Sequence, residues 1–119
     1  LVPSFLSKWL AKRLRSGAVT VECELRTVSS VISEYELERV DLLKIDCEGA
    51  ELDVLTGIEV DHWPQIGKVI AEVHDVEGRL DKVISLLKSH GLTKIFIEKE
   101  AGFENTVLSN VHAIRPTKA

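Results

Sequence analysis

The chain has 119 residues, 45% of them hydrophobic, and a formal net charge of -4 at pH 7. This length is enough for one compact domain and too short for two ordinary ones, so we expect a single core. The sequence contains neither the run of roughly 18 apolar residues that spans a membrane nor a signal peptide. We therefore expect a cytoplasmic protein with no membrane span.

Positive charge is concentrated at the start of the chain. The first 16 residues hold four basic and no acidic residues, and the rest holds the other 11 Lys and Arg residues against all 19 Asp and Glu. Phosphate binding needs a basic face, so the acidic main body argues against a nucleic-acid partner. The chain also contains no methionine and starts at Leu1, and we expect it to be a piece of a longer polypeptide.

Residues 1–17 predict a basic amphipathic helix. Such a helix can pack on its own domain or a neighbouring subunit, bind a groove in a partner, or lie on an anionic membrane. We favour packing on the domain or a subunit, because an isolated helix of this length is marginal in water. Most of its apolar residues share one helical face and its basic residues hold the other: Phe5, Leu6, Trp9, Leu10 and Leu14, against Lys8, Lys12, Arg13 and Arg15.

The next part of the chain alternates between strand and helix patterns. Residues 19–25 alternate apolar and polar side chains, which predicts a half-buried strand near a sheet edge. Residues 28–35 predict a short helix, and the apolar run at residues 42–46 predicts a buried strand. Residues 50–55 predict another short helix, which we expect Gly57 to close in a left-handed conformation.

The second half repeats the order of strand and helix. Residues 58–67 have no clean period and predict a loop or helical turn, with Trp63 at the rim of the core. Residues 68–75 predict a second apolar strand. Residues 77–90 have the most regular helical pattern in the chain, and Gly91 ends it.

The chain ends with two predicted strands, at residues 92–98 and 107–114, close enough in sequence to pair antiparallel. The whole order predicts an α/β domain over residues 18–119, with a mostly parallel sheet that ends in an antiparallel hairpin. No G-x-G-x-x-G turn is present, so the glycine-rich front end of a nucleotide-binding fold is missing. Cys23 and Cys47 lack metal-ligand spacing, and we interpret both as reduced thiols in the core.

Candidate functional side chains lie at the ends of the strands predicted at residues 42–46 and 68–75. Asp46 and Glu48 lie at the end of one predicted strand, and Glu72 and His74 at the end of the next. Neighbouring parallel strands lie about 4.8 Å apart, so we expect these groups to meet at the sheet edge where α/β proteins bind ligands. Alternatively, Asp46 caps the following helix, Glu48 is solvated, and Glu72 and His74 hydrogen-bond nearby backbone. The spacing is a weak metal signal, and we expect no metal.

Two motifs resemble a known family. The sequence K-I-D-C-E-G-A-E at residues 44–51, followed on the next strand by E-V-H at residues 72–74, resembles the signature of the FkbM family of S-adenosylmethionine-dependent methyltransferases. The resemblance covers residues 18–115. It implies the carboxyl-terminal half of a Rossmann-like class I methyltransferase fold, in which the strands over residues 42–46 and 68–74 are the fourth and fifth of seven. Family members carry a glycine-rich cofactor loop and a ribose-binding acidic residue ahead of this region, and neither is found here.

The resemblance implies an S-adenosylmethionine-dependent O-methyltransferase that acts on a hydroxyl of a small metabolite, sugar or polyketide-like acceptor. As a carboxyl-terminal fragment, the chain is expected to be inactive alone. Such an enzyme needs positioning and a general base. The resemblance favours Asp46 for orienting the acceptor hydroxyl, accepting its proton or contributing to a divalent metal site, with Glu48 and Glu72 as further orienting residues. His74 is a candidate base, because histidine changes charge near neutral pH.

Other classes of function remain open. The chain can be a non-catalytic binding or dimerisation module derived from a methyltransferase, with apolar surface buried in a homodimer or against the missing amino-terminal half. A membrane-surface protein led by the basic helix is a third class, which the acidic body opposes. No cofactor-binding residue is assigned.

Overall fold

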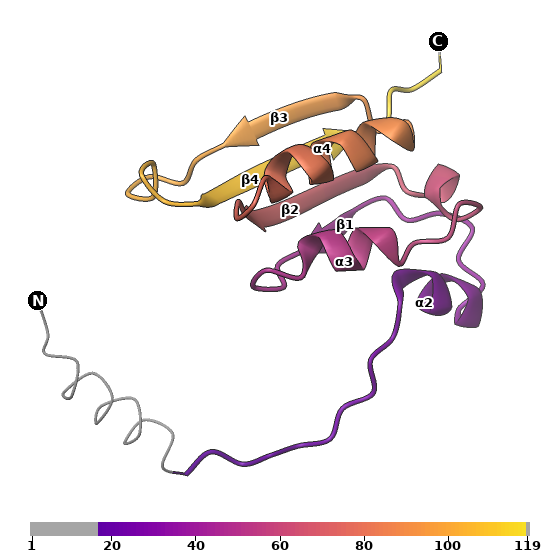
Figure 1. Ribbon diagram of the computed structural model, residues 1–119. Coiled ribbons are helices and arrows are strands. Elements are labelled where there is room, and N and C mark those ends of the chain that lie inside the picture. Colours follow the sequence, from indigo (N-terminus) through magenta and orange to yellow (C-terminus); the bar gives the residue numbers. More distant parts are fainter. Residues whose placement is uncertain (1–16, 119) are drawn as a thin grey trace, which may run out of the picture.

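The computed structural model describes residues 17–118. Their core is a four-stranded sheet with helices on one face (Figure 1). The predicted amphipathic helix lies outside the described residues, apart from Gly17. The elements follow in the order α2 (Val28–Glu34), β1 (Leu43–Ile45), α3 (Glu51–Thr56), a 3₁₀ turn (Trp63–Gln65), β2 (Lys68–His74), α4 (Arg79–Ser89), β3 (Lys94–Glu98) and β4 (Leu108–Ile114).

The sheet is mixed, with strand order β1-β2-β4-β3. The pair β1–β2 is parallel, whereas β2–β4 and β3–β4 are antiparallel. The α/β class and the antiparallel final hairpin are therefore confirmed, but the prediction of a mostly parallel sheet is wrong. The physical reason is the short connection after β3, which reverses the chain and inserts β4 between β3 and β2.

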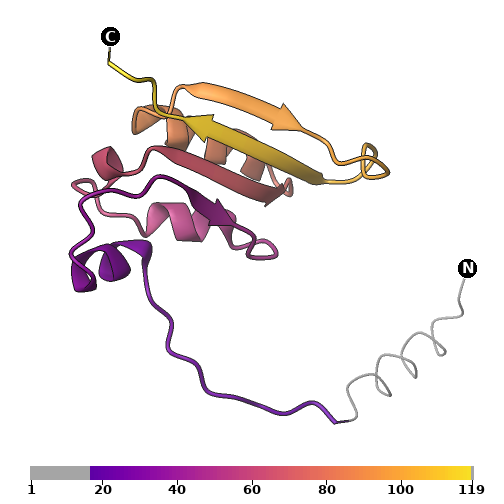
Figure 2. The same ribbon diagram turned by 180° about the vertical axis from the view of Figure 1, so that it is seen from behind.

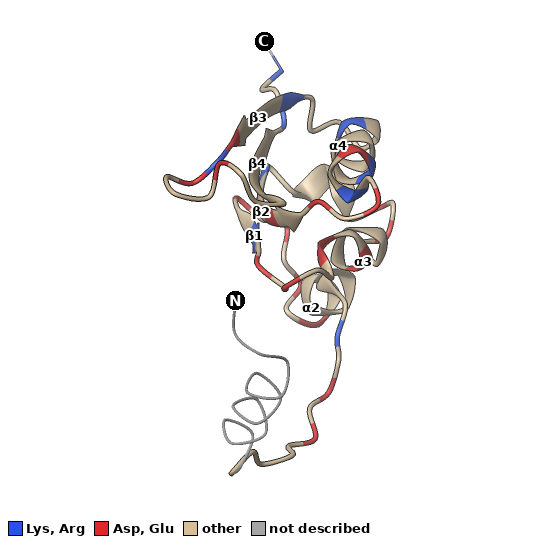
Figure 3. Ribbon diagram, turned by 60° about the vertical axis from the view of Figure 1, so that its left-hand side comes forward, with Lys and Arg blue, Asp and Glu red and all other residues tan. Residues whose placement is uncertain are grey.

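Alternation along the two central strands separates the two faces of the sheet. Buried residues of β2 and β4 alternate with half-buried ones, and α3 and α4 cover only the buried side, as Figure 3 shows. The other face lies open in Figure 2. In this register Ile70 lies opposite His112 and Glu72 opposite Asn110, so the open face carries both polar and apolar side chains. The strand residues of the covered face include Ile45, Val69, Ala71, Val73, Val111 and Ala113.

Two predictions about apolar side chains are wrong. Residues 19–25 form no strand and are exposed, with Leu25 96% accessible. Alternation alone does not make a strand, because a strand needs a neighbour for its backbone hydrogen bonds, and none of the described strands lies beside this segment. Cys23 and Cys47 are both exposed. Cys47 misses the core because β1 already ends at Ile45.

The three helices predicted within residues 17–118 are confirmed with small shifts at their ends. The buried residues Val83 and Leu87 of α4 face the core, and Gly91 ends this helix with a φ of 88°. Gly57 instead has a φ of -77° and lies in the right-handed region, so its predicted left-handed conformation is wrong. Its amide still closes α3 by donating to the carbonyls of the last turn. None of the helices in residues 17–118 is long and apolar enough to cross a membrane.

Arg115 ties the end of β4 to the turn that precedes β2. Its Nη2 donates to Trp63 O at 2.7 Å and its Nε donates to Ile66 O at 3.0 Å. Trp63 is 2% exposed, deeper than the rim position predicted for it, and its ring stacks on His90 with centroids 4.3 Å apart. The end of α4, the turn and β4 are therefore held together at one point.

Replacing Arg115 is expected to destabilise the chain. Arg115→Met removes both side-chain donors and is predicted to lower the free energy of unfolding by about 1–3 kcal/mol, because Ile66 O loses its side-chain donor and Trp63 O keeps only the amide of Ile66. Urea denaturation measures this difference. The control is Arg39→Met, which removes a guanidinium that is 75% exposed and pairs with Asp41 on the surface. If Arg39→Met lowered the free energy of unfolding as much as Arg115→Met, the stabilising role given to the hydrogen bonds of Arg115 would be contradicted.

Candidate functional site

The turn between β1 and α3 shapes the edge of the sheet where the predicted site lies. Glu48 and Gly49 have φ values of 50° and 105°, a left-handed pair that reverses the chain sharply after β1. This conformation is costly for a residue with a side chain such as Glu48. It turns the amide of Gly49 toward the start of α3, where Gly49 N donates to Glu51 Oε1 at 2.8 Å. The turn is therefore fixed by a side chain of the helix that follows it.

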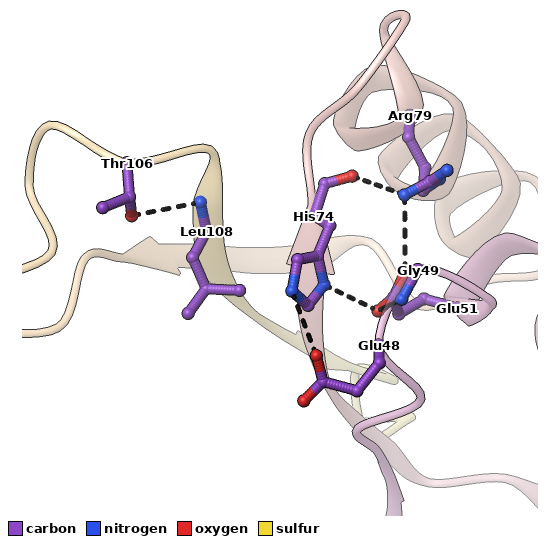
Figure 4. A network of polar contacts seen from close by, with 7 residues as sticks. All are labelled: Glu48, Gly49, Glu51, His74, Arg79, Thr106 and Leu108. Carbon is purple, nitrogen blue, oxygen red and sulfur yellow. Dashed lines mark hydrogen bonds and ion pairs between the residues drawn. The ribbon is translucent and has the colours of Figure 1, made fainter. Parts of the chain in front are cut away.

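Glu51 is a fully buried carboxylate at the centre of this edge. Its Oε1 also lies 3.1 Å from His74 Nδ1, within hydrogen-bond distance. Its Oε2 has no hydrogen-bond partner among the described residues, and the nearest cation is Arg79 Nη1 at 3.9 Å. Figure 4 shows these side chains converging from the turn, α3, β2 and α4. One carboxylate thus links four segments.

The start of α4 is fastened to the end of β2. Arg79 Nη1 donates to the carbonyl oxygen of His74 at 2.8 Å. Asp75 Oδ1 accepts from Leu80 N at 3.0 Å and so satisfies an amide in the first turn of α4, although the cap position itself is Gly78. The backbone on both sides of His74 is therefore held in place.

Burial of Glu51 by itself would raise the pKa of its carboxyl group. Hydrogen bonds from Gly49 N and from its own backbone amide, together with the hydrogen bond and charge of His74, outweigh that effect and bring the pKa below the ordinary value of 4.5. Glu51 is therefore ionised at neutral pH.

The structure brings together two of the four predicted site residues. His74 Nε2 lies 3.7 Å from Glu48 Oε2, and their side chains are 27% and 85% exposed. Asp46 is exposed directly after β1, and Glu72 is half-buried on the open sheet face, one pleat before His74. Asp46 does not cap α3, because the cap residue is Ala50 and no side-chain cap bond is present. The roles assigned to the four residues stay predictions.

Glu51 and Arg79 are the site residues that sequence reasoning missed. Glu51 falls inside the K-I-D-C-E-G-A-E motif, but a carboxylate at the start of a short helix is normally solvated, and glutamate is rarely buried without a partner. The sequence does hold one indication that Glu51 belongs to the site. It follows Glu48 by three residues, at the same sheet edge as His74. Nothing in the helical pattern of α4 distinguishes Arg79 from a surface arginine.

The carboxylate oxygens and the imidazole at this edge can accept hydrogen bonds from a hydroxyl group. No group of three or more His, Cys, Asp or Glu within residues 17–118 has the geometry to hold a metal. A cavity of about 850 Å³ lies at the opposite edge, near the start of β2 and the end of β4, where it is lined by Lys68 and Arg115. That cavity is remote from His74 and shares no residue with the network around Glu51.

The structure thus has carboxylates and an imidazole at the carboxyl ends of two parallel strands, the place where α/β proteins generally bind ligands. Residues 3–104 match the family model described as the methyltransferase FkbM domain. The chain therefore belongs to the FkbM family of methyltransferases, a family that implies S-adenosylmethionine as methyl donor.

Similar proteins come from bacteria and fungi. The 31-O-demethyl-FK506 methyltransferase FkbM of Streptomyces tacrolimicus is 42% identical over 95 residues, covering 80% of this chain and 36% of that protein. Methyltransferase sdnD of Sordaria araneosa is 41% identical over 83 residues, 63% of this chain and 32% of that protein. The AMB antimetabolite synthetase AmbE of Pseudomonas aeruginosa is 40% identical over 112 residues, 90% of this chain and 5% of that protein. The chain thus spans about a third of the two methyltransferases. No solved structure matches it significantly.

The low pKa of Glu51 predicts how stability changes with pH. Below the ordinary value of 4.5, the unfolded chain binds a proton at this residue while the folded chain does not. The free energy of unfolding therefore falls as the pH drops through the pKa of the folded state, and this contribution is fully present above 4.5. Urea titrations across this acid range measure it.

Glu51→Gln should flatten this acid dependence relative to the unmodified chain. The matched control is Asp53→Asn, which removes an exposed acidic residue from the same first turn of α3 and should leave the dependence nearly unchanged. Equal acid dependence in Glu51→Gln and the unmodified chain would contradict the role given to this carboxylate.

Proposed function

We propose that this chain contributes the acceptor edge of an S-adenosylmethionine-dependent O-methyltransferase. The observation that supports this most directly is His74 at the carboxyl end of β2. Its side chain is 27% exposed, its Nε2 lies beside Glu48 and its Nδ1 is engaged by Glu51. In this proposal β1 and β2 are the fourth and fifth strands of a Rossmann-like class I methyltransferase sheet. The hairpin β3–β4 is its reversed pair, and the other strands come from the remainder of the protein.

The residues at this edge suit the reacting end of the cofactor. S-adenosylmethionine, when bound, supplies a methyl group attached to a positively charged sulfur. Asp46 and Glu48 offer exposed carboxylates, which attract a cationic centre and accept hydrogen bonds from a hydroxyl group. A glycine-rich loop is not among residues 17–118, so we assign the adenosine site to the remainder of the protein.

The roles of the side chains follow from what methyl transfer requires. Asp46, Glu48 and Glu72 orient the acceptor hydroxyl by accepting its hydrogen bonds, so that its oxygen is aligned with the methyl group. His74 Nε2 takes the hydroxyl proton as the carbon–oxygen bond forms and the carbon–sulfur bond breaks. The imidazolium that results lies between Glu48 and Glu51, whose charges stabilise it.

The acceptor class rests on a relative. The printed name of the Streptomyces tacrolimicus protein describes methylation of an oxygen of 31-O-demethyl-FK506. We propose, on that basis, a hydroxyl of a small metabolite, sugar or polyketide-like molecule as the acceptor of this chain.

A non-catalytic binding or dimerisation module is the second candidate function. It is supported by the apolar side chains left exposed on the sheet and its borders, including Leu42, Phe96 and Ile97 at about half exposure. Exposed apolar surface of this kind marks contact with another chain or another part of the same one. Under this function the chain would pair through its open face without binding the methyl donor.

Cofactor binding separates the two functions. In isothermal titration of the protein of which the chain is part, the affinity for S-adenosylmethionine is expected to weaken about tenfold or more in Asp46→Ala. The matched control is Asp41→Ala, which removes an exposed carboxylate at the opposite edge of the sheet and should bind as the unmodified chain does.

Absence of heat at millimolar concentrations in that protein would contradict cofactor binding and favour the module. Equal weakening in both variants would show that the effect is a general loss of negative charge rather than a contact made by Asp46.

A further inference from the structure

We propose that Glu51 is a positioning residue for His74: its buried carboxylate holds the proton on Nδ1 and leaves Nε2 free to act as a base. This inference deepens the proposed O-methyltransferase function and rests on it. Glu51 itself touches neither acceptor nor methyl donor in this account, because it is fully buried.

The tautomer of His74 follows from the chemistry of its partner. An ionised carboxylate has no proton to donate and can only accept hydrogen bonds. At 3.1 Å from Glu51 Oε1, Nδ1 of His74 must therefore be the donor. In a neutral imidazole one ring nitrogen carries the proton and the other is an acceptor, so Nε2 is left with its lone pair.

Ionisation of Glu51 has its own structural support. Gly49 N donates to the same Oε1 at 2.8 Å, and the first turn of a helix favours negative charge. These contacts agree with the lowered pKa of Glu51. The carboxylate is thus an anion at the pH at which His74 would work.

The charged groups around His74 come from three elements. Glu48 of the turn lies beside Nε2 at 3.7 Å, Glu51 of α3 beside Nδ1, and Arg79 of α4 on the carbonyl oxygen. Leu108 lies opposite on β4 and carries no charge. No basic group among these faces Nε2, so nothing there competes with an acceptor hydroxyl for its lone pair.

The two carboxylates have different tasks because their burial differs. Glu51 is inaccessible and held by two donors, so it fixes the orientation of the ring before any ligand arrives. Glu48 is 85% exposed and too far from Nε2 for a hydrogen bond, so it is free to move aside for the acceptor. It can then pair with the ring once Nε2 carries the proton.

Nitrogen-15 NMR of the histidine ring tests this directly in the chain, without cofactor or acceptor. At a pH where the ring is neutral, the long-range proton–nitrogen spectrum distinguishes a protonated Nδ1 from a protonated Nε2. We expect the Nδ1–H form of His74 to exceed the Nε2–H form by about tenfold or more, as a hydrogen bond to a charged group allows. An Nε2–H form in the unmodified chain would overturn the proposal.

Glu51→Gln should reduce this preference to a mixture, because a glutamine amide can donate to Nδ1 as well as accept from it. Asp53→Asn, the matched control on the same turn, should keep it. A preference unchanged in a folded Glu51→Gln chain would overturn the proposal. Should Glu51→Gln unfold, the spectrum of the unmodified chain still decides the tautomer.

Activity separates this proposal from the proposed function. In the protein of which the chain is part, methyl transfer from labelled S-adenosylmethionine to a panel of hydroxylated acceptors should fall about 10²- to 10⁴-fold in His74→Asn, whose side-chain amide still donates to Glu51 but is not a base. Glu51→Gln should lower kcat more than it raises KM and should change the pH profile.

Unmodified protein that transfers no methyl group would contradict the proposed function while leaving the tautomer result intact. Activity that Glu51→Gln leaves unchanged would contradict the positioning role alone.

Discussion

The hydrogen bonds to the buried carboxylate of Glu51 are the interaction on which this edge of the molecule depends. A charge without access to water is tolerated only where donors compensate it. Gly49 and His74 supply those donors, and Arg79 contributes a positive charge nearby. Because the donors come from the turn and from β2, satisfying one carboxylate also fixes the turn, the end of the strand and the ring of a histidine.

The rest of the fold brings these groups to one place. Parallel pairing of β1 and β2 puts the ends of both strands at the same edge, and α3 and α4 cover one face of the sheet so that their first turns reach that edge. At the opposite edge, the hydrogen bonds of Arg115 and the stacked pair Trp63–His90 hold the elements together. The two edges thus have different chemistry: a network around an anion at one, and packing around an aromatic pair at the other.

Much of this arrangement could be predicted from the sequence. Within residues 17–118, apolar periodicity located the three helices, and the apolar runs located the four strands to within a few residues. The polar side chains that follow β1 and β2 identified the edge at which Glu48 and His74 meet. The K-I-D-C-E-G-A-E motif identified the family, which the match over residues 3–104 confirms.

The remaining features depend on contacts that no local pattern encodes. The position of β4 between β2 and β3 depends on which strands pair. Apolar periodicity does not reveal this, because a strand has the same alternation whichever strand lies beside it. Residues 19–25 have the alternation of a strand but no partner among the described residues. Glu51 has the pattern of a surface residue, and its burial becomes evident only when the turn through Glu48 and Gly49 closes over it.

The central claim is that ligands bind at the edge formed by the ends of β1 and β2. The most direct test is an amide NMR titration of the protein of which the chain is part with the demethylated product of S-adenosylmethionine. Within this chain, the account predicts shift changes confined to residues 46–51 and to the neighbourhood of His74. Changes centred instead on Gly67 and Gly91, which line the cavity at the opposite edge, would contradict it.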